Sequence, residues 1–182
     1  PDGKWLATGC RDATVKLWDL ARIHDAPVLK GHSDEITSLD FAPDGRLLAS
    51  GSADGTVRIW DSTNGHVLEV LPDHGGIVRA VAFSPDGKQL ATAAGRCVMM
   101  WDVATWQRLH SLTKHTDFVQ CLAFSSDGEL LASGSSDKTV VIWDPSSGNV
   151  RQTLSRHTDA VLGLAFRPGQ QQLASCGVDK TV

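Results

Sequence analysis

The dipeptide Trp-Asp occurs four times in this chain, at intervals of 42, 41 and 42 residues. The pairs begin at Trp18, Trp60, Trp101 and Trp143. A histidine recurs with nearly the same period, at His32, His74, His115 and His157. Self-similarity at a period of about 40 to 50 residues is typical of stacked-repeat folds. A catalytic constellation usually occurs once, so a motif that occurs four times indicates a scaffold.

The composition argues against two classes of partner. The chain has 17 Lys+Arg against 21 Asp+Glu, a net charge of -4, and no basic run. Nucleic-acid-binding proteins usually carry a basic stripe. No apolar stretch approaches the roughly 18 residues that a membrane helix needs. With 41% hydrophobic residues the chain is predicted to be globular, and we expect neither nucleic acid nor membrane as a partner.

The cysteines do not predict a metal site. They are Cys10, Cys97, Cys121 and Cys176. They form no CxxC pair and no zinc-ligand spacing, and each falls in a predicted strand, so we expect small buried thiols. No phosphate-binding glycine motif occurs either. We therefore expect no metal and no cofactor, and a reducing compartment, the cytoplasm.

One period of the sequence predicts four antiparallel strands. They cover 36–42, 47–53, 56–61 and 66–71. Pro43-Asp44-Gly45 supplies the first turn, because proline presets φ and glycine tolerates a positive φ. Asp54-Gly55 is a strong hairpin signal, and Thr63-Asn64-Gly65 supplies the last turn.

The first two strands of this period are apolar or small on both faces. The residues concerned are Ile36, Leu39, Phe41, Leu48, Ala49 and Gly51. A sheet buried on both sides needs a sheet on each side, and the radial packing of a propeller supplies them. No window sustains the apolar periodicity of a helix. The predicted fold class is therefore all-β.

At this point the chain resembles the WD-repeat β-propeller family over all 182 residues. The resemblance rests on Gly31-His32, on the turns that follow Phe41 and Phe83, on Asp54 six residues before Trp60, and on the repeated Trp-Asp ending. It implies an open arc of four-stranded blades, that is, a partial propeller. The predicted units are 1–31 (partial blade), 32–73, 74–114, 115–156 (blades) and 157–182 (partial blade).

A histidine, a serine or threonine, an aspartate and a tryptophan recur at fixed spacing within the repeats. Serine, histidine and aspartate could suggest an acyl-transfer triad. The resemblance implies instead a structural network that ends on the indole N–H, and no nucleophile-elbow motif is present. The predicted network residues are Thr8, Asp12, Trp18, His32, Ser50, Asp54, Trp60, His74, Thr92, Trp101, His115, Ser133, Asp137, Trp143, His157, Ser175 and Asp179. We expect no catalytic residue.

The third blade departs from the pattern. Gly95 stands where the turn aspartate is expected, and the blade is one residue shorter between Leu90 and Trp101. Its network is therefore predicted to be incomplete around His74.

Three weaker candidates are each weighed against a structural role. Asp34-Glu35 is expected on a solvated loop rather than in acid–base catalysis. His110 and His115 have no third ligand, which argues against a metal site. Trp106 replaces a turn glycine, and its indole either forms an exposed contact anchor or folds onto its own blade.

We predict a non-enzymatic scaffold for protein partners, with the sensor or docking region of a larger enzyme, such as a kinase or protease, as the alternative. The resemblance places partner contacts on the face that carries the loop before the inner strand and the second-to-third hairpin. The corresponding positions are Arg11, Glu35, Thr37, Ala53, Ile77, Arg79, Phe118, Gln120, Ser136, Ala160, Leu162 and Val178. They differ between repeats, as an asymmetric partner would require, although unbound loops also vary.

Two further expectations follow from the repeat. Related propellers usually have about seven blades, so the chain is expected to be an internal slice of a longer protein, with further blades of the same chain as its neighbours. Phe41, Phe83, Phe124 and Phe166 are expected at equivalent buried positions.

Overall fold

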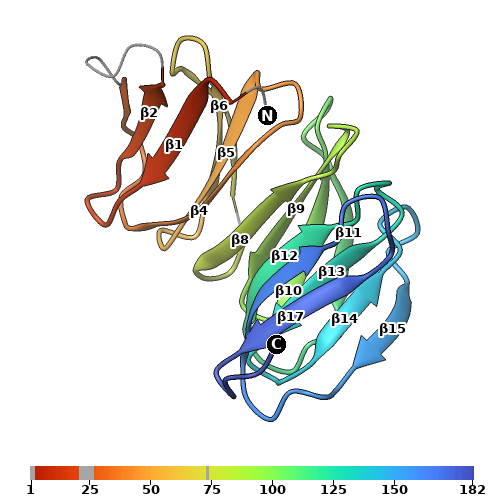
Figure 1. The fold of residues 1–182 in the computed structure, drawn as a ribbon. Helices are drawn as coiled ribbons and strands as arrows, with labels where there is room; N and C mark the ends of the chain where they lie inside the picture. The colour runs from red at the N-terminus through yellow and green to blue at the C-terminus, as the bar shows by residue number, and fades with distance from the viewer. Residues whose placement is uncertain (1–2, 21–26, 73) are drawn as a thin grey trace.

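The computed structural model describes residues 3–20, 27–72 and 74–182. Within these ranges, seventeen strands and no helix are present, and the strands form five antiparallel sheets (Figure 1). The predicted all-β class is confirmed. Residues 1–2 and 21–26 of the first predicted unit, and Asp73 at the end of the second, lie outside the described residues.

Each sheet is built from strands that are consecutive in the sequence. The first blade contains β1 (Trp5–Gly9), β2 (Val15–Asp19) and β3 (Val28–Leu29). The second contains β4 (Ile36–Phe41), β5 (Leu47–Ser52), β6 (Val57–Asp61) and β7 (Val67–Leu71). The third contains β8 (Val78–Phe83), β9 (Gln89–Ala94), β10 (Cys97–Asp102) and β11 (Arg108–Thr113). The fourth contains β12 (Val119–Phe124), β13 (Leu131–Ser135), β14 (Val140–Trp143) and β15 (Val150–Leu154), and the fifth β16 (Val161–Phe166) and β17 (Leu173–Gly177).

The turns behave as their residues predict. Gly45 and Gly55 have φ of 72° and 81°, a region that glycine reaches without steric cost. The four strands of the second blade begin and end within one residue of the predicted ranges. Local turn chemistry and strand pattern therefore agree in this repeat.

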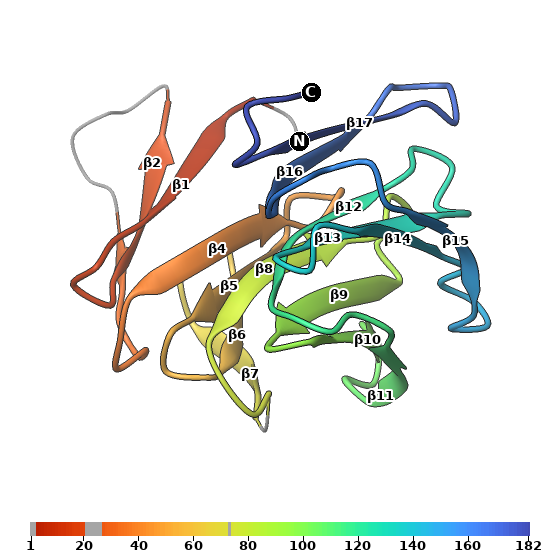
Figure 2. The ribbon, with the colours of Figure 1, turned by 90° about the horizontal axis from the view of Figure 1, so that it is seen from below.

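The blades follow one another round an arc in chain order (Figure 2). Strands β4, β8, β12 and β16 are the first strands of their blades, and each contacts the next one along the arc. The arrangement is that of a partial propeller, as predicted.

The hydrophobic cores lie between blades rather than within them. The cluster between the first two blades joins Val15 and Leu17 to Leu48 and Trp60. Three further clusters fill the other junctions in the same way. Each sheet therefore needs its neighbours to bury both faces, which explains the apolar residues on both faces of the inner strands.

A small residue on the second strand lets the next blade approach closely. A Cβ added at Gly51 would lie 2.7 Å from Val78 Cγ1, and one added at Gly134 would lie 2.7 Å from Val161 Cγ1. The valine side chains of one blade therefore occupy the space that a larger residue on the preceding blade would need.

Replacing Gly51 by valine is expected to lower the free energy of unfolding by about 1 to 3 kcal/mol, because the added side chain overpacks the junction. Urea unfolding followed by circular dichroism measures the loss. Gly76→Ala is the matched control, since a Cβ there meets no atom within 4 Å. An unchanged midpoint for Gly51→Val would contradict the packing of this junction.

The four phenylalanines occupy equivalent register positions but are not equally buried. Each is the cross-strand partner of a leucine near the start of the second strand of its blade, as Phe41 is of Leu48 and Phe83 of Leu90. Only Phe83 is buried, at 6% exposure, while Phe41, Phe124 and Phe166 are partly buried. The equivalent positions were predicted correctly, whereas burial was predicted for all four and three are only partly buried.

Trp106 is not an exposed anchor. It has a φ of 54°, is partly buried, and packs against the core between the second and third blades. The structure thus supports the second of the two roles considered for this indole.

Candidate functional site

The recurring polar residues lie in contact within the second and fourth blades. His32 Nδ1 lies 2.8 Å from Asp54 Oδ2, and its Nε2 lies 2.7 Å from Ser50 Oγ. Trp60 Nε1 donates to the same serine oxygen at 2.8 Å. The fourth blade repeats this chain through His115, Asp137, Ser133 and Trp143, at distances of 2.8 to 2.9 Å.

The other blades contain parts of the same chain. In the fifth, His157 contacts Asp179 and Ser175, each at 2.8 Å. In the third, Thr92 Oγ1 accepts a hydrogen bond from Trp101 Nε1 at 3.0 Å and lies 3.0 Å from His74 Nε2.

In the first blade, Trp18 Nε1 donates to Thr8 Oγ1 at 2.9 Å. Asp12 accepts from Thr14 N and Thr14 Oγ1, at 3.0 and 2.5 Å.

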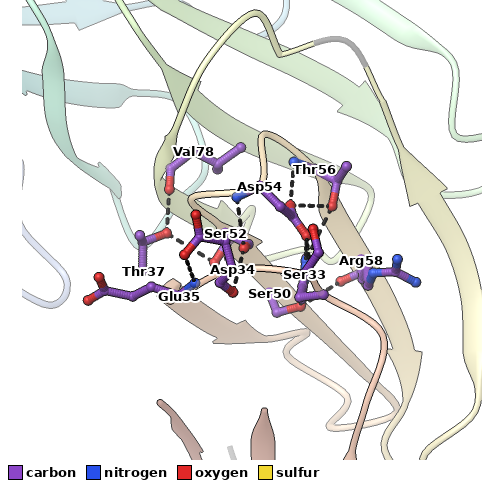
Figure 3. A network of polar contacts seen from close by, with 12 residues as sticks. Ser33, Asp34, Glu35, Thr37, Ser50, Ser52, Asp54, Thr56, Arg58 and Val78 are labelled. Atoms are coloured by element: carbon purple, nitrogen blue, oxygen red, sulfur yellow. Dashed lines mark hydrogen bonds and ion pairs between the residues drawn. The ribbon is translucent and has the colours of Figure 1, made fainter. Parts of the chain in front are cut away.

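The turn aspartate also fixes the loops around the histidine. Asp54 accepts from Ser33 N at 3.0 Å and from Thr56 N and Thr56 Oγ1 at 2.9 and 2.7 Å (Figure 3). The threonine was missed in the sequence analysis, although Asp-x-Thr recurs. Its members are Thr14, Thr56, Thr139 and Thr181.

The electrostatics of the network assign its protons. Burial lowers the pKa of His32, although Asp54 opposes this shift. Burial by itself would raise the pKa of Asp54, but hydrogen bonds from Thr56, Ser33 and His32 together hold it well below its usual range. An ionised carboxylate only accepts hydrogen bonds, so His32 Nδ1–H donates to it. His32 Nε2 then accepts from the Ser50 hydroxyl, which itself accepts from Trp60.

This arrangement suits a structural role. Ser50 and Ser133 have no exposed surface, and His32 is 7% exposed. A serine nucleophile must reach a substrate carbonyl and needs an oxyanion hole beside it. Here each serine hydroxyl is enclosed between an indole and an imidazole. Each donor in this series of hydrogen bonds, from the tryptophan to the aspartate, has an acceptor.

The predicted partner-contact residues all lie at or near the surface, at the end of the blades where the loop before the inner strand meets the second-to-third hairpin. We call this end the loop face. Exposed members are Arg11, Thr37, Ile77, Phe118, Leu162 and Val178, and partly buried members are Glu35, Ala53, Arg79, Gln120, Ser136 and Ala160. Backbone hydrogen bonds hold loop and hairpin together, such as Ala53 N to Glu35 O at 2.8 Å and Ser136 N to Phe118 O at 2.9 Å.

Several of these side chains contact one another or the next blade. Arg11 Nε lies 3.6 Å from Glu35 Oε1. The Arg79 guanidinium carbon lies 5.3 Å from the centre of the Phe118 ring.

Two further members are held by hydrogen bonds. Gln120 Nε2 donates to Ser136 Oγ at 2.7 Å. Thr37 Oγ1 donates to the Val78 carbonyl of the neighbouring blade (Figure 3). Thr37 and Gln120 are thus partly committed to internal contacts.

Further along β4, two more side chains join the second blade to the backbone of β8. Ser38 Oγ accepts from Val81 N at 3.1 Å, and Asp40 Oδ2 accepts from Phe83 N at 2.7 Å. Burial raises the pKa of Asp40, and the backbone N–H groups of Phe83 and Phe41 offset only part of this shift. At neutral pH the ionised Asp40 therefore carries a desolvation cost.

Asp40→Asn is expected to unfold at an equal or higher urea concentration than wild type at pH 7, because the amide oxygen still accepts from Phe83 N. The folded-state pKa of Asp40 lies above its unfolded value, so wild type gains stability as the pH falls through that folded pKa. The difference in free energy of unfolding between Asp40→Asn and wild type should therefore be smaller at pH 4 than at pH 7. Asp40→Ala, which removes the acceptor, should lower stability at both pH values. A less stable Asp40→Asn at pH 7 would contradict this account.

The comparisons with known proteins identify the family. A family model described as the first WD40 domain of WDHD1 matches residues 1–182. The chain belongs to the WD-repeat family. It is also similar to the general transcriptional corepressor TUP1 of Saccharomyces cerevisiae, with 44% identity over 41 residues. That match covers 22% of this chain and 6% of the yeast protein. WD-repeat domains in general serve as protein-interaction scaffolds.

The remaining residues singled out from the sequence have ordinary environments. His110 Nε2 lies 3.1 Å from the Ser146 carbonyl oxygen, while His115 belongs to the network. In the ranges 3–20, 27–72 and 74–182, no three metal-ligating side chains cluster. Across the same part of the chain, no helix has the length and apolarity needed to cross a membrane.

The prediction of buried cysteines was wrong for two of the four. Cys10 and Cys176 are exposed, and Cys97 and Cys121 are partly buried. Cys10 and Cys176 lie in the first and fifth blades, each of which has a described neighbour on one side only. Burial raises the pKa of Cys121 to about 11, so this thiol stays protonated and unreactive at neutral pH.

Proposed function

We propose that this chain is a non-enzymatic scaffold that binds protein partners through its loop face. The observation that carries the proposal is a contrast within each blade. The recurring polar side chains are engaged in internal hydrogen bonds, whereas the positions that differ between blades include large exposed apolar side chains. Ile77 and Phe118, on blades with described neighbours on both sides, are 42% and 50% exposed. Leu162 and Val178 are 53% and 48% exposed on the fifth blade, which has a described neighbour on one side only. Exposed aromatic and aliphatic side chains are typical anchors of protein interfaces.

Protein is the partner class that this face suits best. The net charge of -4 opposes binding to polyanions such as nucleic acid or an anionic membrane. The apolar side chains of the loop face alternate with single charges, such as Arg79 and Glu35, which can pair with charges on a protein surface. The identity of the partner is left to experiment.

The test compares two leucines with the same exposure. Leu162 on the loop face and Leu68 on the outer strand β7 are both 53% exposed. Proteins that co-purify with the full-length wild type should be lost with Leu162→Asp and Phe118→Ala, and kept with Leu68→Asp. If both loop-face variants retain every co-purifying protein, the loop face is not the interface. Unchanged circular dichroism spectra would show that the variants fold.

We also propose a cytoplasmic location. The four cysteines are free thiols in the structure, and two of them are exposed, as a reducing compartment allows. Fluorescence microscopy of the tagged full-length protein, with cell fractionation, tests this. Recovery in an oxidising compartment would contradict it.

A further inference from the structure

Within the described residues, the loop face of the third blade lacks the aspartates that its neighbours carry at two positions. Two residues after the network histidine, the second, fourth and fifth blades carry an aspartate, whereas the third carries Gly76. The aspartates are Asp34, Asp117 and Asp159, and each accepts a hydrogen bond of 2.7 Å from the next backbone N–H. Gly95 likewise replaces the turn aspartate, and Gly75 precedes Gly76.

These glycines leave open space at the loop face. A Cβ placed on Gly75, Gly76 or Gly95 would meet no other atom within 4 Å. In the described residues 74–79 and 95–96, no carboxylate is present, and the charged residues are Arg79 and the exposed Arg96. We call this part of the loop face the glycine patch and define it as Gly75, Gly76, Gly95 and the side chain of Arg79.

Arg79 lies at the start of β8 and retains hydrogen-bonding capacity. Its Nε is buried and has no hydrogen-bond partner within the described part of the chain. Across those same residues, no ion pair with a carboxylate is present, in contrast to Arg11, which pairs with Glu35. A guanidinium presents a planar fork of donors that matches a carboxylate. The buried Nε is out of reach of a ligand, but among the described residues no hydrogen bond engages the two terminal nitrogens of Arg79, so these donors remain for a ligand.

An aromatic side chain borders the same guanidinium, and further apolar side chains are exposed on the neighbouring blades. The Phe118 ring centre lies 5.3 Å from the guanidinium carbon of Arg79, within the range of a cation–π contact that holds the charge in place. Phe118, Ile77 and Leu162 are 50%, 42% and 53% exposed. They lie on the fourth, third and fifth blades, whose inner strands β8, β12 and β16 are consecutive neighbours (Figure 2).

We propose that Arg79 and Phe118 form a binding site for an acidic peptide segment of a partner protein. The side-chain carboxylate of an aspartate or glutamate pairs with Arg79 beside the glycine patch, and a large apolar side chain next to it in the peptide packs on Phe118. This inference rests on the proposed scaffold function and adds the chemistry of the partner.

The charge pattern favours a single carboxylate over a polyanion. Asp117 and Asp159 occupy the adjoining loops, so a chain of phosphates laid across the face would meet repulsion on the fourth and fifth blades. A single carboxylate that pairs with Arg79 need not extend over the loops that carry Asp117 and Asp159. The apolar surface next to it also suits a peptide side chain better than a sugar-phosphate backbone.

Selection from a phage-displayed library of random dodecapeptides on the immobilised full-length protein tests the specificity. Wild type should enrich sequences with an aspartate or glutamate next to a leucine, isoleucine, phenylalanine or tryptophan. Arg79→Met should lose the acidic preference, and Phe118→Ala the apolar one. Arg108→Met, on the exposed outer strand β11, is the matched control and should keep both. No enrichment, or the same acidic consensus with Arg79→Met, would overturn the proposal.

Fluorescence anisotropy with the enriched peptide then measures each contribution. Replacing its acidic residue by the amide, or Arg79 by methionine, should each raise the Kd about tenfold, and the two changes together should raise it little further. Arg79→Lys should recover part of the affinity, since it restores charge but not the fork. Additive effects would overturn the direct pairing, and tighter binding of a phosphoserine version would assign the site to phosphopeptides instead.

The outcomes separate this inference from the scaffold function. If co-purifying proteins depend on Leu162 but selection yields no acidic consensus, the loop face binds proteins in another way and only the acidic-peptide site fails. If neither co-purification nor selection depends on loop-face residues, both proposals fail.

Discussion

Asp137→Ala is expected to lower the free energy of unfolding by about 3 kcal/mol, because it removes the acceptor of several charge-assisted hydrogen bonds at once. Thr116 N, Thr139 N, Thr139 Oγ1 and His115 Nδ1 contact its carboxylate at 2.6 to 2.9 Å. The Asp137 side chain is 8% exposed, so water replaces little of what is lost. Urea unfolding of the chain at pH 7 measures the change.

The same carboxylate makes part of the stability dependent on pH. Burial alone would raise the pKa of Asp137, but the hydrogen bonds from Thr139, Thr116 and His115 outweigh it and lower the pKa to about 2. The unfolded chain protonates this group near its ordinary value of 3.8. The contribution of Asp137 is therefore fully present above pH 5 and is lost as the pH falls toward 2.

The difference in stability between wild type and Asp137→Ala should accordingly narrow on acidification. Asp127→Ala is the control, because Asp127 also accepts hydrogen bonds in a turn but is exposed, and its loss should be much smaller. An equal loss for the two variants, or a gap that widens below pH 4, would contradict the network.

Replacing Trp60 or Trp143 by phenylalanine should destabilise the chain more than the same change at Trp101. Each substitution removes an indole N–H and leaves a buried hydroxyl without its donor, at a cost on the order of 1 to 3 kcal/mol. The indoles of Trp60 and Trp143 donate to Ser50 and Ser133, in chains that continue to a histidine and an aspartate. In the third blade, Gly95 supplies no carboxylate, so the contacts that run from Trp101 through Thr92 to His74 do not end on a turn aspartate.

The three tryptophans make a fair comparison because their burial is similar. Trp60, Trp101 and Trp143 are 1%, 7% and 2% exposed, so the cavity left by each truncation is comparable. The difference in lost stability between Trp60→Phe or Trp143→Phe and Trp101→Phe then measures the contribution of the polar network. We expect this difference to be about 1 kcal/mol. Urea unfolding by circular dichroism suits this series, since fluorescence would change with the tryptophan count. Equal losses at all three positions would show that the third blade compensates for Gly95.

The sequence by itself predicts what repeats. The period of the Trp-Asp pairs, and the Pro-Asp-Gly and Asp-Gly turns that bound the short runs between them, locate the strands of the second blade within one residue. These features depend on local turn chemistry and on pairing between adjacent strands, which the order of residues encodes directly. The residues of the polar network recur with the same period, and the resemblance to the WD-repeat family indicated their structural role, although Thr56 was overlooked despite its regular place after Asp54.

Tertiary structure decides what lies between blades. Phe83 N donates to Asp40, and the Val78 carbonyl accepts from Thr37, contacts between residues that occupy different repeats and follow no repeated motif. The placement of Arg79 over Phe118 has the same origin. Sequence spacing fixes the position of a residue within its own sheet, but the packing of whole sheets sets its distance to the next blade. The exposure of Cys176 and the partial burial of Phe41 depend on that packing.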